Sequence, residues 1–312
     1  MKDIFSTYHP IINFFYFLVV LLVSMFVTHP IYMVISLAAA ATYSVLLQGW
    51  KKTFKMNLFF MLPTMLIVAG VNGFFNHYGE TVLTELPNGK PITLEAIVYG
   101  LIMAGILAEV VMWFSCYNKV MTSDKFIYLF GKIIPGFSLV LAMCLRFVPK
   151  FMKQTKVISN GQKCIGRDIS MGNIFDRVKH GITILSIMIT WALENAVDTA
   201  DSMKARGYGI GGRTAFSVFR FDYRDKVMFA GMAALGAITF WGILHGEAAA
   251  VYNPKIVLGG IPFNPAGTIT MVSYGIFVFL PVILQAWETI KWHFMSKRIQ
   301  KRAAGGYRLW EC

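Results

Sequence analysis

A single long helix is predicted from residues 180–214, HGITILSIMITWALENAVDTADSMKARGYGIGGRT. Its apolar residues recur at the three- and four-residue spacing of a helix face. They are Ile184, Ile187, Trp191, Ala192, Val197, Ala200 and Met203. Glu194, Asp198 and Asp201 fall on another face and form an acidic stripe. At about 1.5 Å per residue such a helix is about 40 Å long, which suits it to transmit movement.

The predicted helix ends at an arginine. Arg206 lies in the last turn, where a cation meets the negative end of the helix dipole. Gly207 follows as a natural C-cap. The helix end therefore presents a fixed, exposed charge, as a lever that acts on another protein would. The alternative is an ordinary helix end, because a basic residue followed by glycine ends many helices.

The composition is that of an integral membrane protein. Of the 312 residues, 56% are hydrophobic and only 14% are charged, and the mean hydropathy is +0.58. A soluble domain carries about 25% charged residues. The net charge of +13 does not indicate nucleic acid, because the basic residues cluster on one side of the apolar spans. That is the positive-inside pattern of a chain embedded in membrane lipid.

Six apolar spans predict an all-α, polytopic membrane protein. They are about 11–28, 30–48, 56–76, 94–116, 227–246 and 268–290. Lys51, Lys52 and Lys55 follow the second span and place that loop inside. The loops 77–93, with a turn at its Pro-Asn-Gly, and 247–267 are expected outside. The basic tail is expected inside, so both termini are cytoplasmic in the cell membrane.

Residues 117–226 form a different region. They carry 17 lysines and arginines against 8 aspartates and glutamates, a net charge of +9. We expect three parts: N-terminal transmembrane helices in 1–116, cytoplasmic coupling helices in 117–226, and C-terminal transmembrane helices with a basic tail in 227–312. Prolines are expected to divide the middle part into helices at about 125–134, 137–148, 151–166 and 176–206. Insertion of 137–148 or 180–193 into the membrane is left open.

The fourth span contains small residues and one carboxylate. Gly100, Ala104 and Ala108 repeat at every fourth position, which permits close helix packing. Packing within the chain is favoured over a partner interface. Glu109 is a functional candidate because it is ionisable within a span. The favoured role is structural, since Lys or Arg at the cytoplasmic end lies within reach.

No catalytic residue, metal site or cofactor is predicted. Gly207, Gly212, Arg213 and Thr214 spell GxxxxGRT, but a phosphate-binding loop needs lysine and lies between a strand and a helix. No HExxH, GxSxG or HxxEH spacing occurs. His9-Pro10 and His29-Pro30 are typical of helix starts. A membrane part with a basic helical region and no catalytic set indicates a subunit driven by another protein.

Several segments resemble one known family. They are DKFIYLFGKIIPG (124–136), LRFVPKF (145–151), GQKCIGRD (161–168) and WALENAVDTADSMKARGYGIGGRT (191–214). Together they resemble the transmembrane T component of energy-coupling factor transporters, the CbiQ-like family, over about residues 5–226. The resemblance implies a subunit between two ABC ATPases and a substrate-binding S component. It further implies that ATP-driven closure of the ATPases is relayed to the S component for vitamin or metal-ion uptake.

In that family two coupling helices end in short arginine motifs that dock in ATPase grooves. The second motif is matched by Ala205, Arg206 and Gly207. The first departs, because this chain has Cys-Ile-Gly at 164–166 where the family has Ala-Arg-Gly or Ala-Arg-Ser. Either Arg167 or Lys163 substitutes, or this contact is weaker.

Two other functions are alternatives for a chain of this composition. A membrane-embedded enzyme acting on lipid would use His180, Glu194 and Asp198, which have neither metal-ligand spacing nor a nucleophile beside them. An autonomous secondary transporter would have inverted repeats and broken helices, and no internal repeat is visible. Co-purification of ATPases distinguishes a coupling subunit from both.

Overall fold

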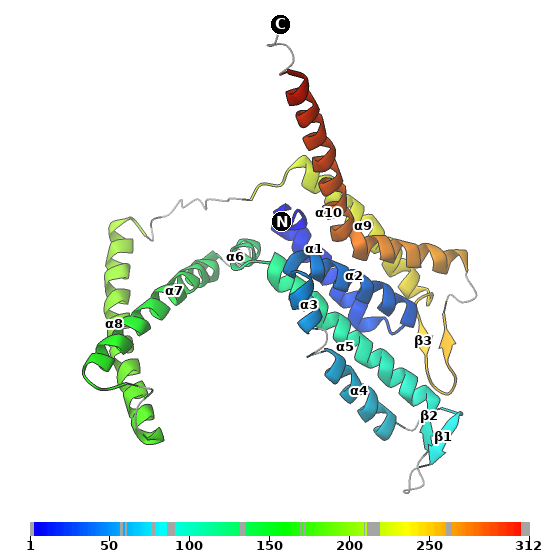
Figure 1. The fold of residues 1–312 in the computed structure, drawn as a ribbon, viewed down its shortest axis with the longest axis horizontal. Coiled ribbons are helices and arrows are strands. Elements are labelled where there is room, and N and C mark those ends of the chain that lie inside the picture. The colour runs from blue at the N-terminus through cyan, green and yellow to red at the C-terminus, as the bar shows by residue number, and fades with distance from the viewer. Residues whose placement is uncertain are drawn as a thin grey trace. The chain divides into compact units, whose positions relative to one another are not determined.

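The computed structural model describes residues 3–56, 59, 61–76, 79–85, 91–131, 135–168, 170, 173–208, 210, 219–259 and 264–306. The chain divides into two compact units, whose elements are labelled in Figure 1. The core unit comprises Met1–Thr122 and Phe219–Cys312, and the paired-helix unit comprises Ser123–Val218. The limits 117–226 of the cytoplasmic region remain a prediction.

The core unit consists of helices joined by two small hairpins, which confirms the all-α fold class. Its helices are η1 (Phe5–Thr7), α1 (Pro10–Phe26), α2 (Pro30–Gln48), α3 (Trp50–Met56), α4 (Leu62–Phe75), α5 (Leu94–Val120), α9 (Tyr223–Leu244) and α10 (Pro265–Gly306). The hairpins pair β1 (Val82–Glu85) with β2 (Pro91–Thr93) and β3 (Ala250–Val251) with β4 (Val257–Leu258), both antiparallel. The turn predicted at 87–89 lies outside the described residues.

The two histidine–proline pairs start helices, as predicted. His9 and His29 are the N-cap residues of α1 and α2, and a proline occupies the first helical position in each case. Each histidine Nδ1 accepts a hydrogen bond from the backbone N–H two residues later, at 3.3 Å. Proline suits this position, because it lacks the N–H that the first turn would leave unpaired.

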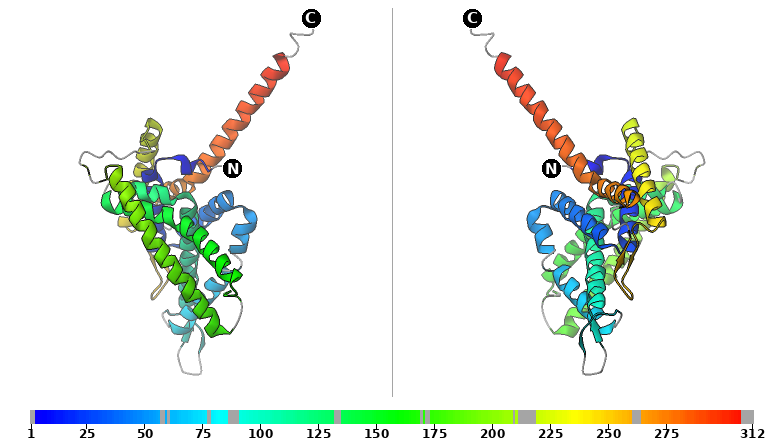
Figure 2. Two further views of the ribbon diagram at one scale, coloured as in Figure 1. Left: turned by 90° about the vertical axis from the view of Figure 1, so that its left-hand side faces the viewer. Right: turned by 90° about the vertical axis from the view of Figure 1, so that its right-hand side faces the viewer.

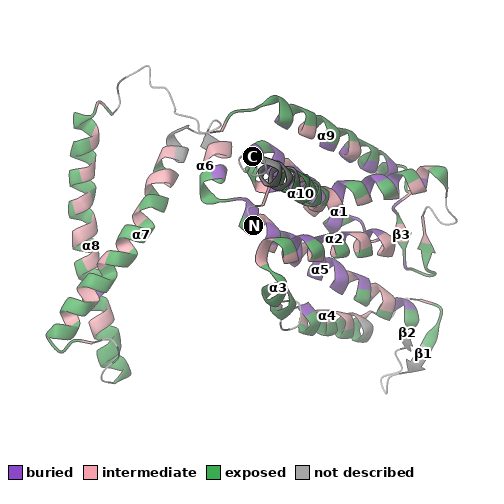
Figure 3. Ribbon diagram, turned by 45° about the horizontal axis from the view of Figure 1, so that its top comes forward, coloured by how far each residue is buried: buried purple, intermediate pink, exposed green. Residues whose placement is uncertain are grey.

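Aromatic side chains from four helices fill the core unit. Trp113 of α5 lies within 6.0 Å of Tyr16 and 6.2 Å of Phe17, both on α1, measured between ring centroids. Its indole Nε1 donates to Ser36 Oγ of α2 at 2.9 Å. Phe277 of α10 stacks on Tyr16 at 5.4 Å. Figure 3 shows the resulting buried positions on α1, α2 and α5.

The small residues of α5 pack within the chain, as favoured from the sequence. Ala104 and Ala108 are buried, and α5 packs along α4. A Cβ added to Gly100 would lie 2.7 Å from the Cβ of Asn72 on α4. This face of α5 is therefore used for helix packing inside the core unit.

Glu109 differs from the expectation that it reaches a cytoplasmic lysine or arginine. Its side chain is buried beside the hydroxyls of Ser24 and Ser36. No ion pair between described residues involves it. The physical reason is its direction: α5 turns this carboxyl toward α1 and α2, which supply hydroxyls and no cation.

The paired-helix unit contains α6 (Ser123–Gly131), α7 (Pro135–Cys164) and α8 (Ile174–Ala205). The two long helices lie side by side in Figures 1 and 2 and contact each other directly. The predicted break at Pro149 is wrong, because α7 runs through it. Proline removes one backbone hydrogen bond, and Lys150 and Phe151, which follow it, are held against α8.

Five of the described helices are long and apolar enough to cross a membrane. They are α2, α5, α8, α9 and the Pro265–Lys297 part of α10. Four of these five, α2, α5, α9 and α10, overlap predicted spans, and the shorter apolar helices α1 and Leu62–Asn72 of α4 overlap the other two. Helix α8 also has the length and composition of a membrane span. Insertion of residues 180–193 into the membrane therefore stays open. Its acidic stripe lies in the C-terminal part of the helix.

Candidate docking site at the ends of α7 and α8

Helix α8 begins and ends at well-defined caps. Asn173 is the N-cap, and its side chain and that of Asp176 form a reciprocal capping box. At the other end Arg206 is the C-cap, and Gly207 adopts a left-handed φ of 79°. A left-handed residue after a helix favours glycine, which has no Cβ to clash.

Two backbone hydrogen bonds close the end of α8. The N–H of Gly207 donates to the carbonyl of Lys204 at 2.9 Å, and that of Tyr208 donates to Met203 at 3.0 Å. This pair of bonds is the Schellman arrangement, which fixes the last turn. Arg206 is exposed on this turn, and no ion pair among the described residues uses it. The guanidinium is thus carried by an ordered backbone and is open to a partner.

The predicted site residues around Arg206 have different surroundings. Ala205 is the last helical residue and is exposed. Glu194, Asp198 and Asp201 are all exposed on one face of α8, as the stripe predicted. Asp201 lies 4.0 Å from Lys204, a solvent-exposed contact, which contributes little to stability.

The face of α8 next to this stripe packs on α7 through polar and aromatic contacts. Lys150 Nζ donates to Asn195 Oδ1 at 2.6 Å and lies 5.2 Å from the centre of the Trp191 ring. Phe151 meets the same ring edge-on at 5.7 Å. The sequence did not predict this contact. Hydrophobic periodicity indicates which face of a helix is apolar, but it does not indicate which other helix packs against that face. These contacts join α7 to α8 where the side chains meet.

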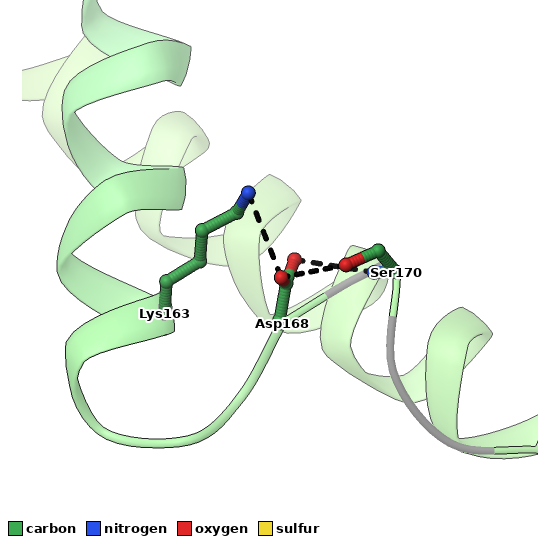
Figure 4. Close-up of polar contacts among 3 residues, drawn as sticks. All are labelled: Lys163, Asp168 and Ser170. Carbon is green, nitrogen blue, oxygen red and sulfur yellow. Dashed lines mark hydrogen bonds and ion pairs between the residues drawn. The ribbon is translucent and has the colours of Figure 1, made fainter.

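Helix α7 ends in a loop that carries the two predicted substitutes, Lys163 and Arg167. Lys163 Nζ lies 3.5 Å from Asp168 Oδ2, as Figure 4 shows. Ser170 donates to the same carboxylate from Oγ at 2.6 Å and from its backbone N–H at 3.1 Å. The Ser170 hydrogen bonds, and then Lys163, lower the pKa of Asp168 from its ordinary value. Lys163 is thus already paired, whereas Arg167 is exposed and in no ion pair among the described residues.

The GxxxxGRT motif gains no support from its surroundings. Its first glycine, Gly207, follows the helix α8 and not a buried strand. Gly212, Arg213 and Thr214 lie outside the described residues. No group of three or more metal-ligating side chains occurs within the part of the chain that the structure describes.

Curated relatives decide the family, although no protein-family model matches the chain. Over 192 residues the chain is 31% identical to the energy-coupling factor transporter transmembrane protein EcfT of Lacticaseibacillus paracasei. That alignment covers 61% of this chain and 72% of the relative. The chain belongs to the EcfT family. Its assignment as a multi-pass membrane protein and as the transmembrane component of a transporter follows.

Two further EcfT proteins are similar to the chain over aligned regions of different length. The chain is 25% identical to EcfT of Staphylococcus aureus over 202 residues, which cover 62% of this chain and 73% of the relative. It is 36% identical to EcfT of Listeria innocua over 105 residues, which cover 33% of this chain and 40% of the relative. The resemblance described from the segments between 124 and 214 is thereby confirmed at the level of the family.

Proposed function

We propose that this EcfT-family chain is the coupling subunit of an ATP-driven importer and that Arg206 docks α8 to an ABC ATPase. The observation that carries the proposal is the exposed arginine on a turn fixed by two hydrogen bonds and a left-handed glycine. Two ATPase subunits are proposed, one at the end of each long helix. A substrate-binding S component, which imports a vitamin or a metal ion, completes the complex.

The chemistry of arginine suits this role. A planar guanidinium makes paired hydrogen bonds to a carboxylate or to backbone carbonyls. Arg206 is held at a helix C-cap, so its Cα moves with the whole helix. Helix α8 has 32 residues and is about 48 Å long. Movement of the ATPase is therefore carried along α8, and the Lys150–Asn195 and Phe151–Trp191 contacts take α7 with it.

The remaining predicted residues have secondary places in this proposal. Arg167 supplies a rim contact at the end of α7, and Lys163 contributes less because Asp168 already neutralises it. The exposed stripe of Glu194, Asp198 and Asp201 keeps the last turns of α8 in water. The basic charge of 117–226 favours a cytoplasmic position for the helix ends and for both termini.

Co-purification and transport test the proposal together. The tagged full-length chain, extracted from its native membrane, should retain ATPase subunits and a small membrane protein. In liposomes that complex should take up a vitamin or a metal ion only when ATP is present on the ATPase side. Uptake by the chain without any ATPase would favour an autonomous carrier. Turnover of lipid by the purified chain would favour an enzyme that uses His180, Glu194 and Asp198.

A further inference from the structure

The two long helices of the paired-helix unit end in the same turn. At α7 the N–H of Gly166 donates to Lys163 at 3.0 Å, and that of Arg167 donates to Gln162 at 2.9 Å. Gly166 has a left-handed φ of 77°, beside 79° for Gly207. These are the bonds that Gly207 and Tyr208 make at the end of α8, at 2.9 and 3.0 Å. Both ends are Schellman turns with the same spacing.

This equivalence fixes which residues correspond. Lys-Cys-Ile-Gly at 163–166 matches Lys-Ala-Arg-Gly at 204–207, position by position. Ile165 therefore occupies the C-cap position that Arg206 occupies in α8. Arg167 corresponds to Tyr208, two residues farther along and beyond the left-handed glycine. Neither Arg167 nor Lys163 stands where the arginine of α8 stands.

The C-cap position of α7 is apolar and open. Ile165 is 62% exposed. Lys163 beside it is held by Asp168 at 3.5 Å, and Ser170 binds the same carboxylate. The local cation is thus partnered within the chain, and the side chain at the cap carries no charge. A single exposed isoleucine is ordinary on a surface, but here it sits at the position that the other helix gives to its docking residue.

We infer that α7 docks through Ile165 into an ATPase groove that is apolar where the groove for Arg206 is lined by hydrogen-bond acceptors. The inference rests on the proposed function, because it takes the end of α8 as a docking site. The reason is desolvation. Isoleucine in a groove lined by acceptors would leave those acceptors buried without a hydrogen bond. In an apolar groove, burial of the isoleucine side chain makes the free energy of binding more favourable. The two grooves are therefore chemically different, and they belong to two different ATPase polypeptides.

The test uses the full complex and the ATPases that co-purify with the wild-type chain. Ile165→Ala should weaken retention of one ATPase polypeptide by roughly tenfold to a hundredfold, since it removes about three carbon groups from an apolar contact. Ile165→Arg should weaken it at least as much, and Ile165→Leu should keep it. The second polypeptide should respond to Arg206→Ala and not to the Ile165 variants. Mass spectrometry of the retained subunits measures both.

A matched control comes from the same unit. Ile174 is the first residue of α8 and is 73% exposed, and Ile174→Ala should leave both ATPases bound. Tighter or unchanged retention with Ile165→Arg would overturn the inference, as would a silent Ile165→Ala or a single ATPase polypeptide in the wild-type complex. Those results leave the proposed function standing. A wild-type chain that retains no ATPase would instead overturn the proposed function.

Discussion

The core unit buries many large apolar side chains, whereas the paired-helix unit buries almost none of those that the structure describes. In the core unit Trp113, Tyr16 and Phe277 are buried almost completely. In the paired-helix unit Ile184 is the only buried apolar side chain among the described residues, whereas Phe175 is 84% exposed. Figure 3 shows the contrast along α7 and α8. The core unit is thus stabilised by its own packing, and the paired helices offer a large apolar surface to lipid or to other subunits.

This difference separates two kinds of residue. Substitutions of buried side chains in the core unit are expected to change stability, because those side chains pack between helices. Substitutions at the ends of α7 and α8 are expected to change assembly, because those side chains have few contacts inside the chain.

Sidedness should differ in an all-or-none manner. In a cysteine-free background, Glu85→Cys and Leu258→Cys should react with a membrane-impermeant thiol reagent added outside intact cells. Asn160→Cys, near the end of α7, should react only after the cells are opened. The reason is the net charge of +9 in 117–226, because positively charged loops are favoured on the inner side of the membrane. Outside labelling at 160 would contradict the six-span orientation.

Stability should distinguish two tryptophans. Trp113→Ala removes a fully buried ring and the donor to Ser36, at a cost of about 3–5 kcal/mol. Trp191→Ala removes a partly exposed ring that contacts Lys150 and Phe151 of the other long helix. Cys116, which is fully buried in the core unit, reports unfolding through the temperature at which a thiol dye reacts with it.

The other cysteines are replaced by serine in both variants. Trp113→Ala should lower that temperature strongly, and Trp191→Ala should leave it near the wild-type value. Equal losses from the two variants would mean that the units do not differ in the way their packing indicates.

Binding at the end of α7 should show the smallest effect. Arg167→Ala is expected to weaken ATPase retention at most about fivefold, since an exposed ionic contact contributes up to about 1 kcal/mol. Lys163→Ala should have less effect, because Asp168 already binds that ammonium group. A titration of solubilised complex with purified ATPase measures both variants. If Lys163→Ala weakens binding and Arg167→Ala does not, Lys163 and not Arg167 makes the ionic contact at the end of α7.

The sequence correctly predicted helix starts and ends, because these depend on a few neighbouring residues. His9 and His29 mark helix starts because proline follows each, and Gly207 marks a helix end because it needs a left-handed φ. Predictions that depend on contacts with a neighbouring helix were less successful. Pro149 was expected to end a helix, but Lys150 and Phe151 are held by α8 on the far side of it. A lysine or arginine was expected to lie within reach of Glu109, but its carboxyl lies beside the hydroxyl groups of Ser24 and Ser36.

The candidate site was predicted in the same uneven way. Arg206 and the exposed acidic stripe follow from spacing within one helix. The equivalence of Ile165 and Arg206 needed the hydrogen bonds at both helix ends, although the repeated Lys-x-x-Gly pattern was visible in the sequence. A search for a positive charge near the first arginine motif led to Arg167 and Lys163. It passed over Ile165, because isoleucine carries no charge.

The central claim is that Arg206 docks α8 to an ATPase. The most direct measurement is the affinity of the solubilised chain for ATPase subunits, with uptake assayed on the same variants. Arg206→Ala should lose roughly thirtyfold to several thousandfold in affinity, because breaking a buried, hydrogen-bonded charged contact costs about 2–5 kcal/mol. Arg206→Lys should rescue it in part, since lysine lacks the planar fork.

Lys204→Ala is the matched control, because Lys204 is another exposed cation of the same turn. It should bind ATPase almost as the wild type does, and the Cys116 reaction temperature should be unchanged in all three variants. A large loss confined to the Arg206 variants is the predicted result. Normal ATPase binding together with normal uptake for Arg206→Ala would contradict the claim and leave Arg206 as an ordinary helix end.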